Sequence, residues 1–132
     1  KGRVKDTFKT AKGLFIVPAP IENRFASNEL INQICVVGLD LPQPIGLINL
    51  SQISKTFSVD EIKQSLLDTL NKVNKDLQIH ERINKLIVIS DQWSLENGFL
   101  TPTNKIKRNV VQNTYKHLYD KWYEYNKKFI MA

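Results

Sequence analysis

The stretch Ser58-Val-Asp-Glu-Ile-Lys-Gln-Ser-Leu-Leu-Asp-Thr-Leu70 decides the fold class, because it begins a long amphipathic helix in the middle of the chain. Ser58 and Glu61 have the spacing of a capping box, in which each side chain binds the other residue's exposed backbone amide. Apolar side chains then recur at intervals of three and four residues, which predicts one stripe that packs on a sheet. The stripe consists of Val59, Ile62, Leu66, Leu70, Val73 and Leu77.

Short apolar runs on both sides of this helix predict the sheet. Ile34–Val37 and Ile45–Ile48 are separated by a loop with two prolines, and we interpret them as an antiparallel central pair. Lys85–Ile89 predicts a further strand. Residues 90–103 then form a loop, in which Asn97-Gly98 indicates a tight turn.

The two ends of the chain complete the expected architecture. Gly2–Phe8 and Gly13–Val17 predict a β-hairpin, and a short helix is expected from Pro20 to about Ser27. A final helix is expected from Lys107 to Lys127, with a buried face made of Val111, Tyr115, Leu118, Trp122, Tyr125 and Phe129. These elements predict an α+β fold: a small, mainly antiparallel sheet covered by helices and preceded by an N-terminal β-hairpin.

Length and composition are those of one globular domain. The chain has 132 residues, of which 42% are hydrophobic and 24% charged. No apolar run approaches the roughly 20 residues that span a bilayer, and we expect a cytoplasmic protein, with peripheral membrane contact left open. The one cysteine, Cys35, is expected to be an inert strand residue. Because the first residue is Lys1 rather than Met, we expect a domain cut from a larger protein.

The net charge of +6 is concentrated in two segments. Residues 1–12 hold five cations and one acid, and residues 105–108 hold three more cations, which leaves the rest of the chain close to balance. Local patches of this kind attract polyanions. Nucleotides, CoA, nucleic acid and anionic lipid are all candidates on charge alone.

The second patch is unusual for its position. Lys105, Lys107 and Arg108 lie at the expected start of the last helix, where the helix dipole disfavours each cation by about 0.3 kcal/mol or more. Metal chemistry is not expected, because His80 and His117 are far apart in sequence and Cys35 is alone. No serine, histidine and acid can be singled out as a catalytic triad.

Together the two segments resemble the C-terminal domain of the adenylate-forming enzymes, and most closely that of the long-chain fatty acid CoA ligases. The first resembles the family's hinge motif, Gly-Arg-x-Lys-Asp-x-x-Lys with a following Lys-Gly and Pro-x-x-Ile-Glu. Its matches are Gly2, Arg3, Lys5, Asp6, Lys9, Lys12, Gly13, Pro18, Ile21 and Glu22. The second resembles the family's terminal lysine motif in its long-chain form, with matches at Gly98, Leu100, Thr101, Pro102, Thr103, Lys105, Lys107 and Arg108.

The resemblance implies roles for several of the matched residues. Lys105 would be the adenylation lysine, with Lys107 as the alternative, and Lys5 with Asp6 would form the hinge. Arg3 would contact the nucleotide ribose. Five matches would face CoA after the domain rotates: Lys9, Lys12, Gly13, Lys107 and Arg108.

The resemblance also implies partners and cofactors. Residues 1–132 would be a single C-terminal lid domain whose partner is a larger N-terminal domain, absent from this chain. That domain would supply most of the site for ATP, Mg²⁺ and fatty acid, with CoA as co-substrate, so the isolated chain is expected to be inactive. A noncatalytic basic module that binds nucleic acid or anionic membrane is the alternative. We expect no nucleic acid, because no aromatic residues alternate with the lysines of the second motif.

Overall fold

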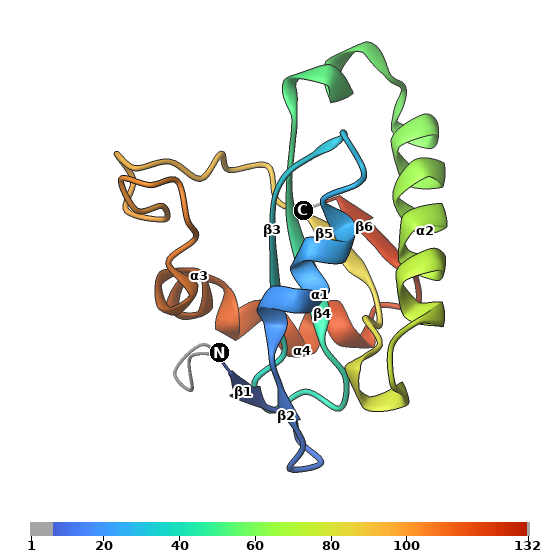
Figure 1. The fold of residues 1–132 in the computed structure, drawn as a ribbon, viewed down its shortest axis with the longest axis vertical. Helices are drawn as coiled ribbons and strands as arrows, with labels where there is room; N and C mark the ends of the chain where they lie inside the picture. Colours follow the sequence, from blue (N-terminus) through green and yellow to red (C-terminus); the bar gives the residue numbers. More distant parts are fainter. Residues whose placement is uncertain (1–6, 132) are drawn as a thin grey trace.

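The structure is a computed structural model that describes residues 7–131. Its main sheet has the strand order β3-β4-β5-β6, formed by β3 (Ile31–Val37), β4 (Ile45–Leu50), β5 (Leu86–Val88) and β6 (Phe129–Met131). β3 and β4 are antiparallel, whereas β5 is parallel to both β4 and β6 (Figure 1). The α+β class is confirmed. The sheet is mixed rather than mainly antiparallel, because helical connections precede β5 and β6 and return each strand in the same direction.

A separate hairpin precedes the sheet, as predicted. It consists of β1 (Phe8–Lys9) and β2 (Phe15–Ile16). β2 is shorter than the predicted strand Gly13–Val17, and most of the predicted strand Gly2–Phe8 lies outside the described residues. Helix α1 (Pro18–Phe25) follows directly, and it begins two residues earlier than expected, with prolines in its first turn. The buried side chains of Phe8 and Ile16 join the same apolar core as this helix.

Helix α2 (Val59–Lys75) begins at the predicted capping box. The Ser58 amide donates to Glu61 Oε1 over 2.8 Å, and the Glu61 amide donates to Ser58 Oγ over 3.1 Å. The predicted stripe is buried from Ile62 to Leu77, but Val59, the first residue of α2, is 55% exposed. The short helices η2 (Gln52–Thr56) and η3 (Ile79–Glu81) flank α2.

The C-terminal segment differs from the single helix predicted over 107–127. It forms α3 (Arg108–Tyr115), η4 (Lys116–Leu118) and α4 (Tyr119–Glu124). The chain then leaves the helix, and Phe129 lies in β6, where it pairs with Leu86. Tyr125, expected on the buried face, is 53% exposed because the helix has already ended.

Alternating strand residues divide the core into two clusters. Ile34 and Val36 pack with α1 and α2 on one face of the sheet, whereas Cys35 and Val37 pack with α3 and α4 on the other. The sheet is therefore a central layer with helices on both faces.

Among residues 7–131, no helix combines the length and apolar character needed to cross a membrane.

Candidate functional site

Lys105 lies in a closed turn at residues 101–106, which we call the lysine turn. Leu100 and Ile106 form a bridge at its base. The Thr101 amide donates to the Lys105 carbonyl and the Asn104 amide to the Thr101 carbonyl, each over 2.8 Å. Asn104 has a left-handed φ of 68°, and the Lys105 amide donates to Thr101 Oγ1 over 3.1 Å. The backbone of Lys105 is thus fixed while its side chain is exposed.

The segment that leads to the lysine turn is anchored in the core. Buried Asn49 donates to the Asp91 carbonyl over 2.9 Å and accepts from the Trp93 amide over 2.7 Å. The rings of Trp93 and Phe99 stack with centroids 6.0 Å apart, and those of Phe99 and Tyr115 with centroids 6.1 Å apart. This aromatic packing joins the turn to α3.

A second anchor joins the lysine turn to the free edge of β3. Gln33 Nε2 donates to the Asn104 carbonyl over 3.4 Å. Three residues after Lys105, the guanidinium of Arg108 donates to both oxygens of Glu22, from Nη1 over 2.7 Å and from Nη2 over 3.1 Å. Nη1 also donates to the Val36 carbonyl over 3.1 Å.

Arg108 therefore lies differently from the other cations of its motif. Its side chain is 20% exposed, whereas Lys105 and Lys107 are exposed. The Glu22 carboxylate supplies negative charge at the start of α3, which explains how a cation is accommodated there. The predicted contact between Arg108 and CoA remains a prediction, and the donors described above point into the domain instead.

Cys35 lies beneath the same ion pair. Arg108 Nη1 is 3.3 Å from its Sγ, and the thiol is buried. Burial raises the pKa of Cys35 from 9.0 to about 12, although the charge of Arg108 opposes this shift. The thiol is therefore protonated at neutral pH and agrees with the expected inert strand residue.

The other described candidates, Lys9, Lys12 and Gly13, surround the hairpin turn and are exposed. The Gly13 amide donates to the Thr10 carbonyl over 2.9 Å, and Gly13 has a φ of +81°, which favours glycine. Lys9 Nζ is 5.9 Å from the centre of the Phe15 ring, and Phe15 is 65% exposed. The turn thus presents cations, an aromatic face and accessible backbone together.

The lysine turn and the hairpin turn lie well apart. The segment that connects β5 to α3 extends away from the sheet on one side, and the β1–β2 hairpin lies at a different end (Figure 1). The structure therefore brings Lys105 and Lys107 together in one group and Lys9, Lys12 and Gly13 in another. Arg3, Lys5 and Asp6 lie outside the described residues.

The described residues do not by themselves form a cage of metal ligands. Within residues 7–131, no group of three or more His, Cys, Asp or Glu side chains is placed to hold a metal. No chemical step is therefore assigned to a metal held by these residues.

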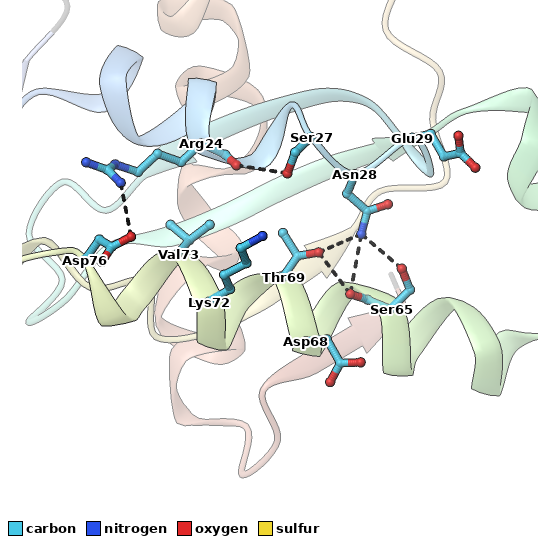
Figure 2. Close-up of a pocket in the computed structure, with 10 residues that line it drawn as sticks. All are labelled: Arg24, Ser27, Asn28, Glu29, Ser65, Asp68, Thr69, Lys72, Val73 and Asp76. Carbon is cyan, nitrogen blue, oxygen red and sulfur yellow. Dashed lines mark hydrogen bonds and ion pairs between the residues drawn. The ribbon is translucent and has the colours of Figure 1, made fainter.

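A polar groove of about 540 Å³ lies between the end of α1 and α2 (Figure 2). Asn28 lines the groove, and its Nδ2 donates to Thr69 Oγ1 over 2.8 Å and to Ser65 Oγ over 3.1 Å. Arg24 and Asp76 form an ion pair of 3.6 Å at one end. The groove contains none of the candidate residues, and its charges are mixed, so we do not assign it to the site.

Sequence reasoning gave no role to several residues that build the site. Glu22 was recognised within its motif, but no local pattern links it to Arg108, 86 residues later. Asn49 lies just outside the predicted strand Ile45–Ile48 and was given no role. A polar residue next to the apolar run Ile45–Ile48 is a signal that could have identified it, since a buried amide needs hydrogen-bond partners.

Comparisons with known proteins cover most of this chain. The model of the family described as the AMP-binding enzyme C-terminal domain matches residues 5–127. The long-chain-fatty-acid–CoA ligase 5 of Rattus norvegicus is 32% identical over 140 residues, which cover 89% of this chain and 20% of that protein. The long-chain-fatty-acid–CoA ligase 6 of Homo sapiens is 28% identical over 139 residues, which cover 92% of this chain and 20% of that protein.

Solved structures share the fold. The adenylation domain of a carboxylate reductase from Mycobacterium chelonae superposes with a TM-score of 0.79 at 25% identity, over 92% of this chain and 20% of that one. The adenylation domain of a carboxylic acid reductase from Segniliparus rugosus, solved with AMP and a carboxylic acid, gives a TM-score of 0.76 at 24% identity, over 92% and 20% of the two chains. The present chain spans about a fifth of the length of these relatives.

Proposed function

Because the chain belongs to the family of AMP-binding enzyme C-terminal domains, we propose that it is the C-terminal domain of an ATP-dependent long-chain fatty acid CoA ligase. The enzyme would first join the fatty acid carboxylate to AMP, with release of pyrophosphate, and then transfer the acyl group to the CoA thiol. The similarity to long-chain-fatty-acid–CoA ligases over most of this chain supports this choice of substrates.

The braced lysine turn is the observation that carries the proposal. Its backbone hydrogen bonds fix where the Lys105 side chain begins, and the side chain is exposed. During adenylation a carboxylate oxygen attacks the α-phosphorus, and charge accumulates on the phosphate oxygens. A cation held at this point stabilises that charge without having to reorganise. We assign this role to Lys105.

The hairpin turn would serve the second half-reaction. Gly13 lets the backbone approach a ligand closely, and Lys9 and Lys12 lie beside it. These features suit the narrow pantetheine arm and the phosphates of CoA. Because the hairpin and the lysine turn lie well apart, the domain would rotate between the two steps to present first one and then the other (Figure 1).

The remaining assignments concern residues outside the described part of the chain. Lys5 and Asp6 would form the hinge of this rotation, and Arg3 would contact the ribose. The N-terminal domain of the full-length protein would hold most of the ATP, Mg²⁺ and fatty acid. We therefore expect no turnover from residues 1–132 alone.

Single-turnover formation of acyl-adenylate by the full-length protein tests the proposal. Lys105→Ala should lower the rate about 10²-fold or more, the scale of one preorganised transition-state contact. Lys107→Ala is the matched control, because this neighbouring cation is also exposed and should matter less for this step. If Lys107→Ala abolishes adenylation and Lys105→Ala does not, the assignment of the lysine is wrong.

A further inference from the structure

We propose that Glu22 and Arg108 form a clamp that positions Lys105 for adenylation. This inference rests on the proposed function. Arg108 would then act through Lys105 rather than as a ligand of CoA, and Glu22 would acquire a role that its place in the first motif does not reveal. Both are positioning residues, since neither is required to touch a substrate.

The clamp binds the outer edge of strand β3. β3 is an edge strand, so the backbone groups that do not face β4 need other partners. At Val36, the amide donates to Glu22 Oε2 over 2.7 Å, and the carbonyl accepts from Arg108 Nη1 over 3.1 Å. The two side chains therefore bind both the strand and each other.

The clamp also connects the two helical layers. Glu22 is on α1, which packs in the cluster on one face of the sheet, and Arg108 begins α3, which packs in the cluster on the other. Their side chains are only 15% and 20% exposed, so solvent screens this ion pair less than one on an open surface. The geometry is that of a bidentate pair, which fixes orientation as well as distance.

Lys105 is held between this clamp and a second contact. On its N-terminal side the Asn104 carbonyl accepts from Gln33 Nε2 over 3.4 Å, and on its C-terminal side the Lys107 amide donates to the Phe99 carbonyl over 2.8 Å. Arg108 follows immediately and is bound to the edge of β3. A shift of about 1 Å at a reacting group can cost on the order of 10²-fold in rate, so loss of the clamp should lower adenylation.

The test compares single-turnover adenylation by the full-length protein in two backgrounds. Glu22→Gln and Arg108→Met are each made alone and together with Lys105→Ala. We expect each single variant to lower the rate about tenfold or more, with the KM for ATP changed less than about threefold. In the Lys105→Ala background, the same changes should have little further effect, because no ammonium group remains to be positioned.

The outcomes separate the clamp from the proposed function. An equal fold-loss in both backgrounds would show that the pair only supports folding, and unchanged rates would show that it positions nothing; either result overturns the clamp alone. If Lys105→Ala itself leaves adenylation unchanged, the proposed function fails and the clamp fails with it.

If the clamp variants do not fold, the adenylation rate of a milder variant can still be measured. Gln33→Ala removes the other contact to the lysine turn from a half-buried position on β3. It should lower the adenylation rate severalfold, again only when Lys105 is present. Asn32→Ala, at the exposed neighbouring position, is the matched control and should leave the rate unchanged. Equal rates for the Gln33 and Asn32 variants would overturn the positioning role.

Discussion

The carboxylate of Glu22 and the guanidinium of Arg108 form a bidentate pair at 2.7 and 3.1 Å, between residues 86 positions apart in sequence. The pair connects the first motif, which ends at Glu22, to the motif that contains Lys105. The same two side chains also hydrogen-bond the backbone amide and carbonyl of Val36 at the edge of β3. Arg108 thus links the two sequence motifs, which lie far apart in the chain.

Removal of this link should destabilise the domain. Arg108→Met leaves the largely buried Glu22 carboxylate without its cation, and we expect the free energy of unfolding to fall by about 2 kcal/mol or more. Lys107→Met removes an adjacent exposed cation and should change stability by less than about 0.5 kcal/mol. Urea unfolding of the 132-residue chain measures both values. Equal losses would mean that the ion pair contributes nothing specific.

Cys35 should make the domain sensitive to alkaline pH. Burial raises the pKa of its thiol to about 12 in the folded chain, against 9.0 as the ordinary value. The unfolded chain therefore releases this proton first, and the stabilising contribution, complete below pH 9.0, is lost as pH rises toward 12. In Cys35→Ala the decline of stability with pH over this range should be shallower by up to about 1.4 kcal/mol per pH unit. Identical slopes in urea unfolding at several pH values would contradict this origin.

Asn104 should tolerate glycine but not a β-branched residue. Its φ of 68° is accessible to asparagine and glycine, whereas valine is strained in this conformation by about 1–2 kcal/mol. We expect Asn104→Gly to keep adenylation within about threefold and Asn104→Val to lower it more, because strain opens the lysine turn. The single-turnover rate of the full-length protein provides the measurement. Equal rates for both variants would show that the backbone conformation of the turn is unimportant.

Lys85 should hold the end of α4 in place. Its buried ammonium group donates to the Tyr123 carbonyl over 2.8 Å and also to the Tyr125 carbonyl. Lys85→Met keeps the apolar stem but leaves these carbonyls without their donor, so we expect a loss of about 1–3 kcal/mol. Lys128→Met, at an exposed lysine nearby, should have little effect. Thermal unfolding distinguishes the two variants, and similar values of Tm would contradict the role of Lys85.

Sequence patterns predicted those helices and strands whose local signal agrees with their tertiary contacts. The capping box at Ser58 starts α2, and the stripe from Ile62 to Leu77 is buried because periodicity identifies the face that meets the sheet. The pairing of β3 with β4 follows from two apolar runs joined by a turn. Each of these two predictions depends on a short segment of the sequence.

The C-terminal segment could not be predicted in the same way. Apolar spacing continues past Leu118, but the helix stops at Glu124, and Lys85 binds carbonyls just before and after this end. Phe129 then pairs with the open side of β5. The position of that strand edge is set by the whole fold, so periodicity alone continued the helix too far.

Some residues of the candidate site could also be predicted from short, local segments of the sequence. Motif spacing selected Lys105 and the hairpin turn, because backbone chemistry at turns is local. The partner of Arg108 depends on how α1 and α3 meet at the edge of β3, which charge counting cannot reveal. Sequence reasoning therefore grouped Arg108 with the exposed cations.

We propose that this one domain presents two separate faces for the two half-reactions. The most direct measurement follows both half-reactions in the full-length protein with Lys105→Ala and Gly13→Val. We predict that Lys105→Ala lowers acyl-adenylate formation about 10²-fold or more while thioester formation from supplied acyl-adenylate changes much less, and that Gly13→Val has the opposite pattern, because valine is strained at its φ of +81°. If both variants slow both half-reactions equally, the division of labour between the two faces is contradicted.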